Sequence, residues 1–387
     1  MVRLFVTGDN HLGKKYDRYP EVKEKLIQSR FDVLQNMVQK AEAEGCDLFV
    51  VTGDLFDSVS TVKVSDVKKA ADILASFTGS VIVLPGNHDY YTGEEKVWKD
   101  FEHALFSRDH NITLIKEFRP YFFDAGEEKI AVYPAFCQSR HSRENNLGWI
   151  REAQIQAEGI INIGLAHGAI KGVTPDMEGI YFLMTEEELS HIPVDVWLIG
   201  HTHIPYPDHL SEDADTPGYK IFNAGTHEQT DLHNHTDGNG FILSIEKQGS
   251  AASVCARKYV SGKVHYYDLD IPVKPDSDTA LADAVKAAVN GKDRNAVVRI
   301  RVSGSVRQAE YQEKDRIYRE LLGSFLTYET EDRELSEEIT VDRIREEFAQ
   351  TSFAAQLLEA FIDQPKELQM VYELIQRCRE NERRSSG

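Results

Sequence analysis

Short apolar runs alternate with longer stretches of mixed polarity along the first 250 residues. Several runs are continuously hydrophobic, which is expected for strands that are covered on both faces. Apolar residues recur near helical spacing from Leu26 to Ala41, ahead of Gly45, and again from Val64 to Phe77. This alternation of strands and helices predicts a layered α/β domain. The predicted strands are Leu4–Thr7, Leu48–Thr52, Val81–Leu84, Ile130–Tyr133, Ile160–Leu165, Val196–Ile199 and Tyr219–Phe222.

The pattern changes beyond residue 255. A strand-like run up to Ile271, an alanine-rich helix at Leu281–Val289 and an alternating strand at Val297–Val302 predict a small α+β domain. From Glu331 onward the chain is charged, and apolar residues at helical spacing on both sides of Pro365 predict two amphipathic helices. The sequence therefore predicts three parts, which are residues 1–255, 262–330 and 331–387.

Composition limits the environments and partners to be expected. The 387-residue chain is 41% hydrophobic and 28% charged, as in soluble globular proteins. Its start is strand-like rather than signal-like, and no apolar run approaches the roughly 20 residues that span a bilayer, so no membrane association is predicted. The four cysteines lie far apart, which indicates reduced thiols in a cytoplasmic protein. The net charge of −20 argues against binding nucleic acid by bulk charge alone, although bound cations would reverse the sign locally.

Five polar clusters each follow the carboxyl end of a predicted strand, the edge at which open α/β sheets bind ligands. Glycines in these clusters permit the tight turns that bring the next side chain over the sheet edge. A lone D-x-H or H-x-H is weak evidence, because such residues often cap helices or close turns, but five clusters in order indicate a metal site. The clusters are Gly8-Asp9-Asn10-His11, Gly53-Asp54-Leu55-Phe56-Asp57, Gly86-Asn87-His88-Asp89, Ala166-His167-Gly168 and Gly200-His201-Thr202-His203.

The side chains in these clusters suit two neighbouring divalent cations. An aspartate can bridge two metals, neutral imidazoles suit transition metals, and an amide oxygen completes a shell without adding charge. These ligand types permit manganese, iron or zinc and disfavour calcium. Two cations about 3.5–4 Å apart lower the pKa of a bridging water, bring it in line with phosphorus and neutralise the developing charge. The sequence therefore predicts a site for two divalent cations, of the kind that can hydrolyse phosphoesters.

The whole set resembles the calcineurin-like metallophosphoesterases, whose pattern is D-x-H, G-D-x-x-D, G-N-H-[D/E], a lone H and G-H-x-H. Within that superfamily the chain is most similar to the bacterial SbcD-type DNA repair exonucleases, through Asp9-Asn10-His11-Leu12-Gly13, Gly53–Asp57 and the segment Phe222–Asp231. The resemblance covers residues 1–245. It implies a layered β-sandwich flanked by helices, the metallophosphoesterase fold, followed by a small capping α+β domain and a helical C-terminal segment.

The resemblance also implies a role for each motif residue. One metal would be held by Asp9, His11, Asp54 and His203, and the other by Asp54, Asn87, His167 and His201. His88 would not be a ligand but would face the scissile phosphate and assist the leaving oxygen, oriented by Asp57. Many archaeal and eukaryotic repair nucleases carry a histidine where Asp57 stands, so the role of that extra histidine does not transfer. Manganese is the metal that the nuclease resemblance implies.

Several other polar residues have two interpretations each. Lys14 and Lys15 follow the first motif, and Arg140 and Arg143 lie in a loop after a strand; they are candidates for holding DNA phosphates or for ordinary surface charge. Tyr90 follows the third motif and either stacks on a base or packs internally. Three histidines in a later loop are interpreted as loop residues or phosphate contacts rather than as a third metal site: His227, His233 and His235.

The sequence thus predicts a metal-dependent DNA exonuclease or endonuclease subunit. Two competing hypotheses are a phosphodiesterase or phosphatase for small nucleotides or phosphoproteins, and a structural subunit that tethers an ATPase near DNA. The segment after residue 260 argues against the first, because small phosphatases generally lack it, and the intact ligand set argues against the second. The resemblance implies an SbcC-type coiled-coil ATPase docked on the C-terminal helices, which would otherwise fold back on their own domain. It also implies a homodimer formed through the first domain.

Overall fold

The computed structural model describes residues 1–106, 110–174, 176 and 178–385 of the chain. The chain forms two compact units. The first unit comprises Met1–Tyr267 together with Asn295–Val297, and the second comprises Asp268–Arg294 together with Val298–Gly387. All five polar clusters lie in the first unit.

Seven strands form the first sheet of the first unit, in the order β4-β3-β2-β1-β11-β12-β9. Neighbours from β1 to β4 are parallel, whereas β11 pairs antiparallel with both β1 and β12. Nearly all side chains of β1, β2 and β3 are buried, which explains their continuous hydrophobicity. β12 continues beyond residue 255, where the sequence interpretation ends the first domain. The strands are β1 (Val2–Thr7), β2 (Leu48–Val51), β3 (Ser80–Val83), β4 (Ile112–Leu114), β9 (Thr216–Pro217), β11 (Asn239–Gln248) and β12 (Ala251–Val260).

Five strands form the second sheet, in the order β10-β8-β7-β6-β5. Neighbours from β6 to β10 in this order are parallel, and β5 pairs antiparallel with β6. The two sheets pack face to face, because Leu4 and Val50 of the first share one hydrophobic core with Ile163 and Leu198 of the second. The strands are β5 (Tyr121–Ala125), β6 (Glu128–Ala135), β7 (Ile161–His167), β8 (Val196–Gly200) and β10 (Ile221–Asn223).

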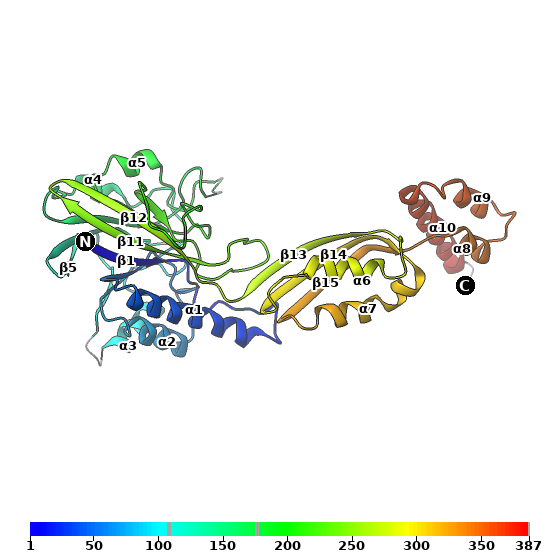
Figure 1. The fold of residues 1–387 in the computed structure, drawn as a ribbon, viewed down its shortest axis with the longest axis horizontal. Helices are drawn as coiled ribbons and strands as arrows, with labels where there is room; N and C mark the ends of the chain where they lie inside the picture. The colour runs from blue at the N-terminus through cyan, green and yellow to red at the C-terminus, as the bar shows by residue number, and fades with distance from the viewer. Residues whose placement is uncertain (107–109, 175, 177, 386–387) are drawn as a thin grey trace. The chain divides into compact units, whose positions relative to one another are not determined.

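Helices cover the outer faces of both sheets (Figure 1). Three of them pack Phe31, Val67 and Trp98 against the first sheet, and two short ones pack Ile150 and Leu189 against the second. The layers therefore run helix, sheet, sheet, helix, and the predicted layered β-sandwich flanked by helices is confirmed. The helices are α1 (Lys23–Ala43), α2 (Val64–Leu74), α3 (Lys96–Leu105), α4 (Gly148–Glu152) and α5 (Glu186–Ser190).

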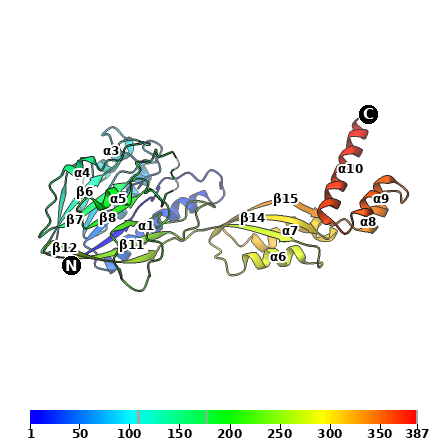
Figure 2. The ribbon, with the colours of Figure 1, turned by 90° about the horizontal axis from the view of Figure 1, so that it is seen from above.

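The second unit contains a three-stranded sheet in the order β13-β14-β15, and α6 and α7 lie on one of its faces (Figure 2). The prediction of helical structure from Glu331 onward is wrong at its start, because Thr327–Glu337 forms β15. This strand is almost entirely polar and has one buried residue, Leu335, so it lacks the apolar alternation that marks a strand. The elements are β13 (His265–Val273), α6 (Ala280–Val289), β14 (Ala296–Val306), α7 (Gln308–Leu322) and β15.

Three helices follow β15, whereas the sequence pattern predicts two. The first predicted helix is divided, because Thr340 and Ser352 each accept a hydrogen bond from a main-chain N–H three residues on and so begin a helix each. Pro365 begins the third helix, where its missing N–H breaks no helical hydrogen bond. The helices are α8 (Val341–Glu347), α9 (Phe353–Ala360) and α10 (Pro365–Ser385). Among the described residues, no helix combines the length and hydrophobicity needed to cross a bilayer.

Candidate metal centre

The five polar clusters converge because each follows a strand that ends at the same edge of the sandwich. The turns after β1 and β2 are hydrogen-bonded to each other, with Asp9 N donating to Gly53 O at 3.0 Å and His11 N donating to Asp54 O at 2.9 Å. The turns after β7 and β8 are joined in the same way, with Gly168 N donating to Gly200 O at 3.1 Å. Residues far apart in the chain therefore meet through main-chain contacts between turns.

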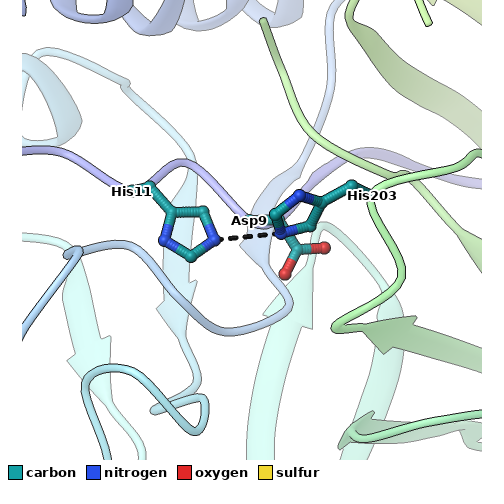
Figure 3. Close-up of side chains that lie close together, drawn as sticks. All are labelled: Asp9, His11 and His203. Carbon is teal, nitrogen blue, oxygen red and sulfur yellow. Dashed lines mark hydrogen bonds between the residues drawn. The ribbon is translucent and has the colours of Figure 1, made fainter. Parts of the chain in front are cut away.

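One group of donor atoms comes from Asp9 and His11 in the turn after β1 and from His203 in the turn after β8, and the three side chains lie close together (Figure 3). One ligand-type atom from each lies within 4.8 Å of the others. The His11 and His203 imidazoles meet through their Nε2 atoms, 3.1 Å apart. Two ring nitrogens facing each other at this distance suit a shared cation or a proton held between them.

A second group comes from Asp54, His167 and His201, again within 4.8 Å of one another. Asn87 joins it, because its Oδ1 lies 3.0 Å from both His167 Nε2 and His201 Nδ1. The Asn87 amide donates to Arg140 O at 3.3 Å, which turns its oxygen toward the histidines. The His167 ring is held from behind, because its Nδ1 lies 2.9 Å from Thr52 O and donates to that carbonyl.

Asp54 lies between the two groups. Its Oδ2 is 3.8 Å from His11 Nε2 in the first group and 3.4 Å from His167 Nε2 in the second. Its other oxygen accepts a hydrogen bond from the main-chain N–H of His88 at 2.8 Å. One carboxylate oxygen thus faces both groups while the other is fixed to the protein, which is the arrangement required of a ligand shared by two cations.

The backbone at this site is strained. Five non-glycine residues in the described chain have positive φ, and four of them belong to the motifs: Asp9 (47°), His11 (43°), Asp54 (51°) and His201 (104°). Such backbone conformations concentrate at functional sites because the surrounding structure must impose them. Gly53, with φ of 107°, has no room for a side chain, since a Cβ would lie 2.1 Å from His167 Nδ1.

The electrostatics of the site favour bound cations. Burial, with the nearby charge of Asp54, raises the pKa of Asp9 to about 7. Burial opposes a charge on His167, but the carboxylates of Asp54 and Asp9 outweigh it and raise the pKa of His167 to about 9. Burial lowers the pKa of His203 well below its usual value, which leaves it a neutral imidazole. In the metal-free protein the carboxylates thus hold a proton on His167, and a divalent cation would take its place, which leaves buried carboxylates beside neutral imidazoles as the donor set.

The structure brings all seven predicted ligands together, and their roles as ligands remain predictions. They are Asp9, His11, Asp54, Asn87, His167, His201 and His203. His88 lies beside them, with its ring centroid 4.7 Å from that of His11. Its Nδ1 is 3.2 Å from the main-chain oxygen of Asp57, whereas the Asp57 carboxylate lies 3.2 Å from His11 Nδ1. Asp57 thus contacts His88 through its main chain and His11 through its side chain.

The residues proposed for substrate contact differ in their distance from the site. Lys14 is partly buried, and its ammonium interacts with the charge of Asp57, close to the first group. Arg140 and Arg143 are exposed in the loop whose main chain contacts Asn87. Lys15 is exposed, and the Tyr90 ring has no recorded polar contact among the described residues. Of the three loop histidines, His227 is fully buried and contacts Arg30 O at 2.9 Å, away from the solvent.

Three residues at the site escaped the sequence interpretation. Asp89 is fully buried and accepts hydrogen bonds from Phe56 N at 2.9 Å and Gly86 N at 2.7 Å, which joins the second and third motifs. The sequence places Asp89 in the G-N-H-D motif but does not indicate its two main-chain hydrogen-bond donors. The ring of Tyr181 lies 5.0 Å from that of His201, and no spacing in the sequence marks it. Arg30 of α1 is buried beneath the first motif, and the apolar pattern of the helix does not mark it as a buried residue.

Comparison with known proteins identifies one family. Residues 2–205 match the model of the family described as calcineurin-like phosphoesterase. The chain is 30% identical over 122 residues to a protein of Danio rerio described as a transmembrane protein with metallophosphoesterase domain. The aligned region covers 31% of this chain and 24% of that protein. The chain therefore spans about a quarter of the length of this relative.

Two examples illustrate the remote similarity of this chain to solved structures. The calcineurin-like phosphoesterase YfkN of Bacillus subtilis is 11% identical with a TM-score of 0.39, over 67% of this chain and 90% of that one. A dimetal phosphatase of Danio rerio is 11% identical with a TM-score of 0.36, over 67% of this chain and 99% of that one. Similarities at this level support no conclusion about activity.

Proposed function

The chain belongs to the calcineurin-like phosphoesterase family, whose members are metal-dependent hydrolases, and from this premise we propose that it cleaves phosphodiester bonds in DNA with two divalent cations. The substrate follows from the sequence similarity to the SbcD-type DNA repair exonucleases, and manganese is the metal proposed on the same ground. The proposal treats the chain as the nuclease subunit of a DNA repair complex.

The position of the Asp54 carboxylate is the observation that supports two-metal chemistry most directly. A single structural metal requires one closed set of ligands, whereas here one carboxylate oxygen faces two separate groups. Each group also contains a histidine whose ring is fixed by the protein, because His11 Nδ1 contacts Asp57 and His167 Nδ1 contacts Thr52. Such fixed imidazoles present their other nitrogen to a metal without further ordering.

The two ligand groups would hold two divalent cations, which would lower the pKa of a water molecule and offset charge on the phosphate. The chain itself contributes His88 as the group that assists the leaving oxygen. A main-chain carbonyl can only accept, so Nδ1 of His88 donates to Asp57 O and Nε2 is the nitrogen directed to the substrate. The strained turns hold these groups in place before substrate arrives, which removes the cost of ordering them during the reaction.

Three features beside the metal groups support nucleic acid as the substrate. Arg140 and Arg143 lie in an exposed loop next to Asn87, and Lys14 lies beside Asp57, so cations border the site on two sides despite the acidic chain. Tyr181 is partly exposed, and its ring packs beside both His201 and His141. Cationic side chains suit phosphates, and an aromatic face beside them suits an unstacked base.

The proposal includes an SbcC-type ATPase as a partner, bound through the C-terminal helices. Large apolar side chains on α9 and α10 are exposed to solvent: Phe353 (79%), Met370 (71%) and Leu374 (62%). The inner residues of α8, α9 and α10 already form a small core of their own, so these outer residues are not needed for it. Met370 and Leu374 are four residues apart and therefore lie on one face of α10, and exposed apolar residues on one helix face are typical of a docking surface.

Degradation of end-labelled linear duplex DNA in manganese tests the proposal, with wild type, His88→Asn and the exposed control His103→Asn compared side by side. Loss of a positioned acid is expected to slow turnover by about 10²–10⁴-fold, with both ions still bound by metal analysis. Bis-p-nitrophenyl phosphate serves as the small diester. Cleavage of this diester with DNA left intact would overturn DNA as the substrate of the isolated chain, and loss of both ions in His88→Asn would contradict its role as a non-ligand.

A further inference from the structure

The Arg30 side chain lies buried in the first unit, with 1% of its surface exposed. A buried guanidinium usually pairs with a carboxylate. None of the hydrogen bonds recorded for Arg30 among the described residues reaches a carboxylate. Instead, Arg30 Nε donates to Asn10 O at 2.9 Å, and Nη2 approaches Asp9 O at 3.5 Å. Arg30 therefore binds the main chain of the first metal motif from behind.

Thr226 completes the support of the same turn. Its hydroxyl accepts from Arg30 Nη2 at 3.3 Å and lies within donor distance of two main-chain oxygens, Asp9 O at 3.0 Å and Glu228 O at 2.8 Å. The remaining Arg30 donor contacts Tyr16 Oη at 3.4 Å and Glu228 O at 3.5 Å. Side chains from α1 and from the loop after β10 thus converge on two successive carbonyl groups.

The supported turn is one that would not hold its shape unaided. Asp9 and His11 both have left-handed backbone conformations, with φ of 47° and 43°. Their carbonyl and side-chain directions are set by these two conformations, and Arg30 bonds the carbonyl of the residue between them. Arg30 itself makes no hydrogen bond to Asp54, His167 or His201 among the described residues. The supported turn is hydrogen-bonded to that group through main-chain donors, with His11 N donating to Asp54 O at 2.9 Å and His201 N donating to the Asp9 carboxylate at 3.0 Å.

We propose that Arg30 is a positioning residue that sets the affinity of one of two metal positions, the one formed by Asp9, His11 and His203. This inference rests on the proposed two-metal function. Groups that orient metal ligands change affinity by about 10- to 100-fold when removed. Loss of Arg30 is therefore expected to weaken this position by that factor and to leave the position formed by Asp54, His167 and His201 near its wild-type affinity.

A positioning role and a purely electrostatic role of Arg30 predict opposite effects of its substitution on metal affinity, so substitution tests the inference. A buried positive charge repels a nearby cation, so if charge were the main effect, Arg30→Met would tighten metal binding and Arg30→Lys would resemble wild type. If positioning is the main effect, both variants weaken binding at one position. Arg30→Met should do so more strongly, because lysine keeps a donor but not the fork that reaches two carbonyls.

Calorimetric titration of the metal-free full chain with Mn²⁺ measures this directly. Wild type should show two sites, and Arg30→Met should show one unchanged site and one weakened about 10- to 100-fold. Arg299→Met is the matched control, because Arg299 is a buried arginine of the second unit that pairs with Asp268, and it should keep both sites. Thr226→Ala should weaken the same position to a smaller extent, and Thr226→Ser should restore it.

A His203→Ala background identifies which position is affected. That variant removes one ligand of the first position. Where its titration shows a single remaining ion, adding Arg30→Lys should leave the affinity of that ion unchanged. Equal weakening of both positions by Arg30→Lys, or unchanged binding in both Arg30 variants, would overturn the inference. If Arg30→Met does not fold, Arg30→Lys and Thr226→Ala decide the question by the same readout. A wild-type chain that binds fewer than two ions would instead refute the proposed function, so the two failures are distinguishable.

Discussion

Replacing Gly53 with alanine should damage the metal site more than its stability cost alone suggests. Gly53 has φ of 107°, and an added Cβ would lie 2.1 Å from His167 Nδ1 and 2.7 Å from its Cγ. A non-glycine residue in such a conformation costs about 1–3 kcal/mol. Overpacking against the imidazole adds about 1–3 kcal/mol, and displacing the ring breaks its 2.9 Å hydrogen bond to Thr52 O, worth about 1 kcal/mol. The sum is about 3–7 kcal/mol.

Urea denaturation and metal analysis of the purified Gly53→Ala variant measure the two effects separately. We expect a loss of at least about 3 kcal/mol in the free energy of unfolding, together with loss of the ion held by the group that contains His167. Gly148→Ala is the matched control, because no atom lies within 4 Å of its Cβ position and its φ is not positive. Wild-type stability with two bound ions in Gly53→Ala would refute the argument that this turn has no room for a side chain.

Two further predictions concern other parts of the chain. Hydrogen bonds from its two arginine partners hold the pKa of Asp268 at about 2, below its usual 3.8. The stabilisation by this ion pair is therefore complete above about pH 4 and is lost as the pH falls through about 2. Urea unfolding across that range should show a decrease of about 1 kcal/mol in the free energy of unfolding, a figure that allows for solvent screening. The Asp268→Asn variant should not show this decrease. Tyr181→Ala should raise KM for DNA by about tenfold while leaving bis-p-nitrophenyl phosphate hydrolysis unchanged, and equal loss on both substrates would contradict a role in holding a base.

The β-sandwich, and the edge of it at which the five polar clusters lie, were predictable because the hydrophobic pattern of the sequence agrees with the overall fold there. Strands such as Leu48–Val51 are buried on both faces, so they are hydrophobic throughout and identifiable without structure. Five of the predicted strands lead directly into a glycine-containing turn with a ligand-type residue. The motif turns of both sheets lie at one edge of the sandwich, which brings residues as distant as Asp9 and His203 together and explains why motif order alone located the site.

Features that depend on distant or solvent-facing contacts were not predictable. Arg30 lies on an amphipathic helix where a basic residue is normally exposed, and its burial depends on Thr226, 196 positions further along. β15 is built from charged residues at the end of a three-stranded sheet, so neither strand alternation nor a helical stripe distinguishes it. Asp57 contacts His88 through its main-chain oxygen and His11 through its carboxylate, and a sequence motif does not distinguish these two contacts.

The ligand groups draw on both sheets, with Asp9 and Asp54 following strands of the first and His167 and His201 following strands of the second. Bound metal ions would therefore cross-link the two sheets of the sandwich. The unfolded chain has no such site, so each ion present at 100 times its dissociation constant adds about 2.7 kcal/mol to the free energy of unfolding. Metal supply would then govern how long the folded protein survives, in addition to how fast it works.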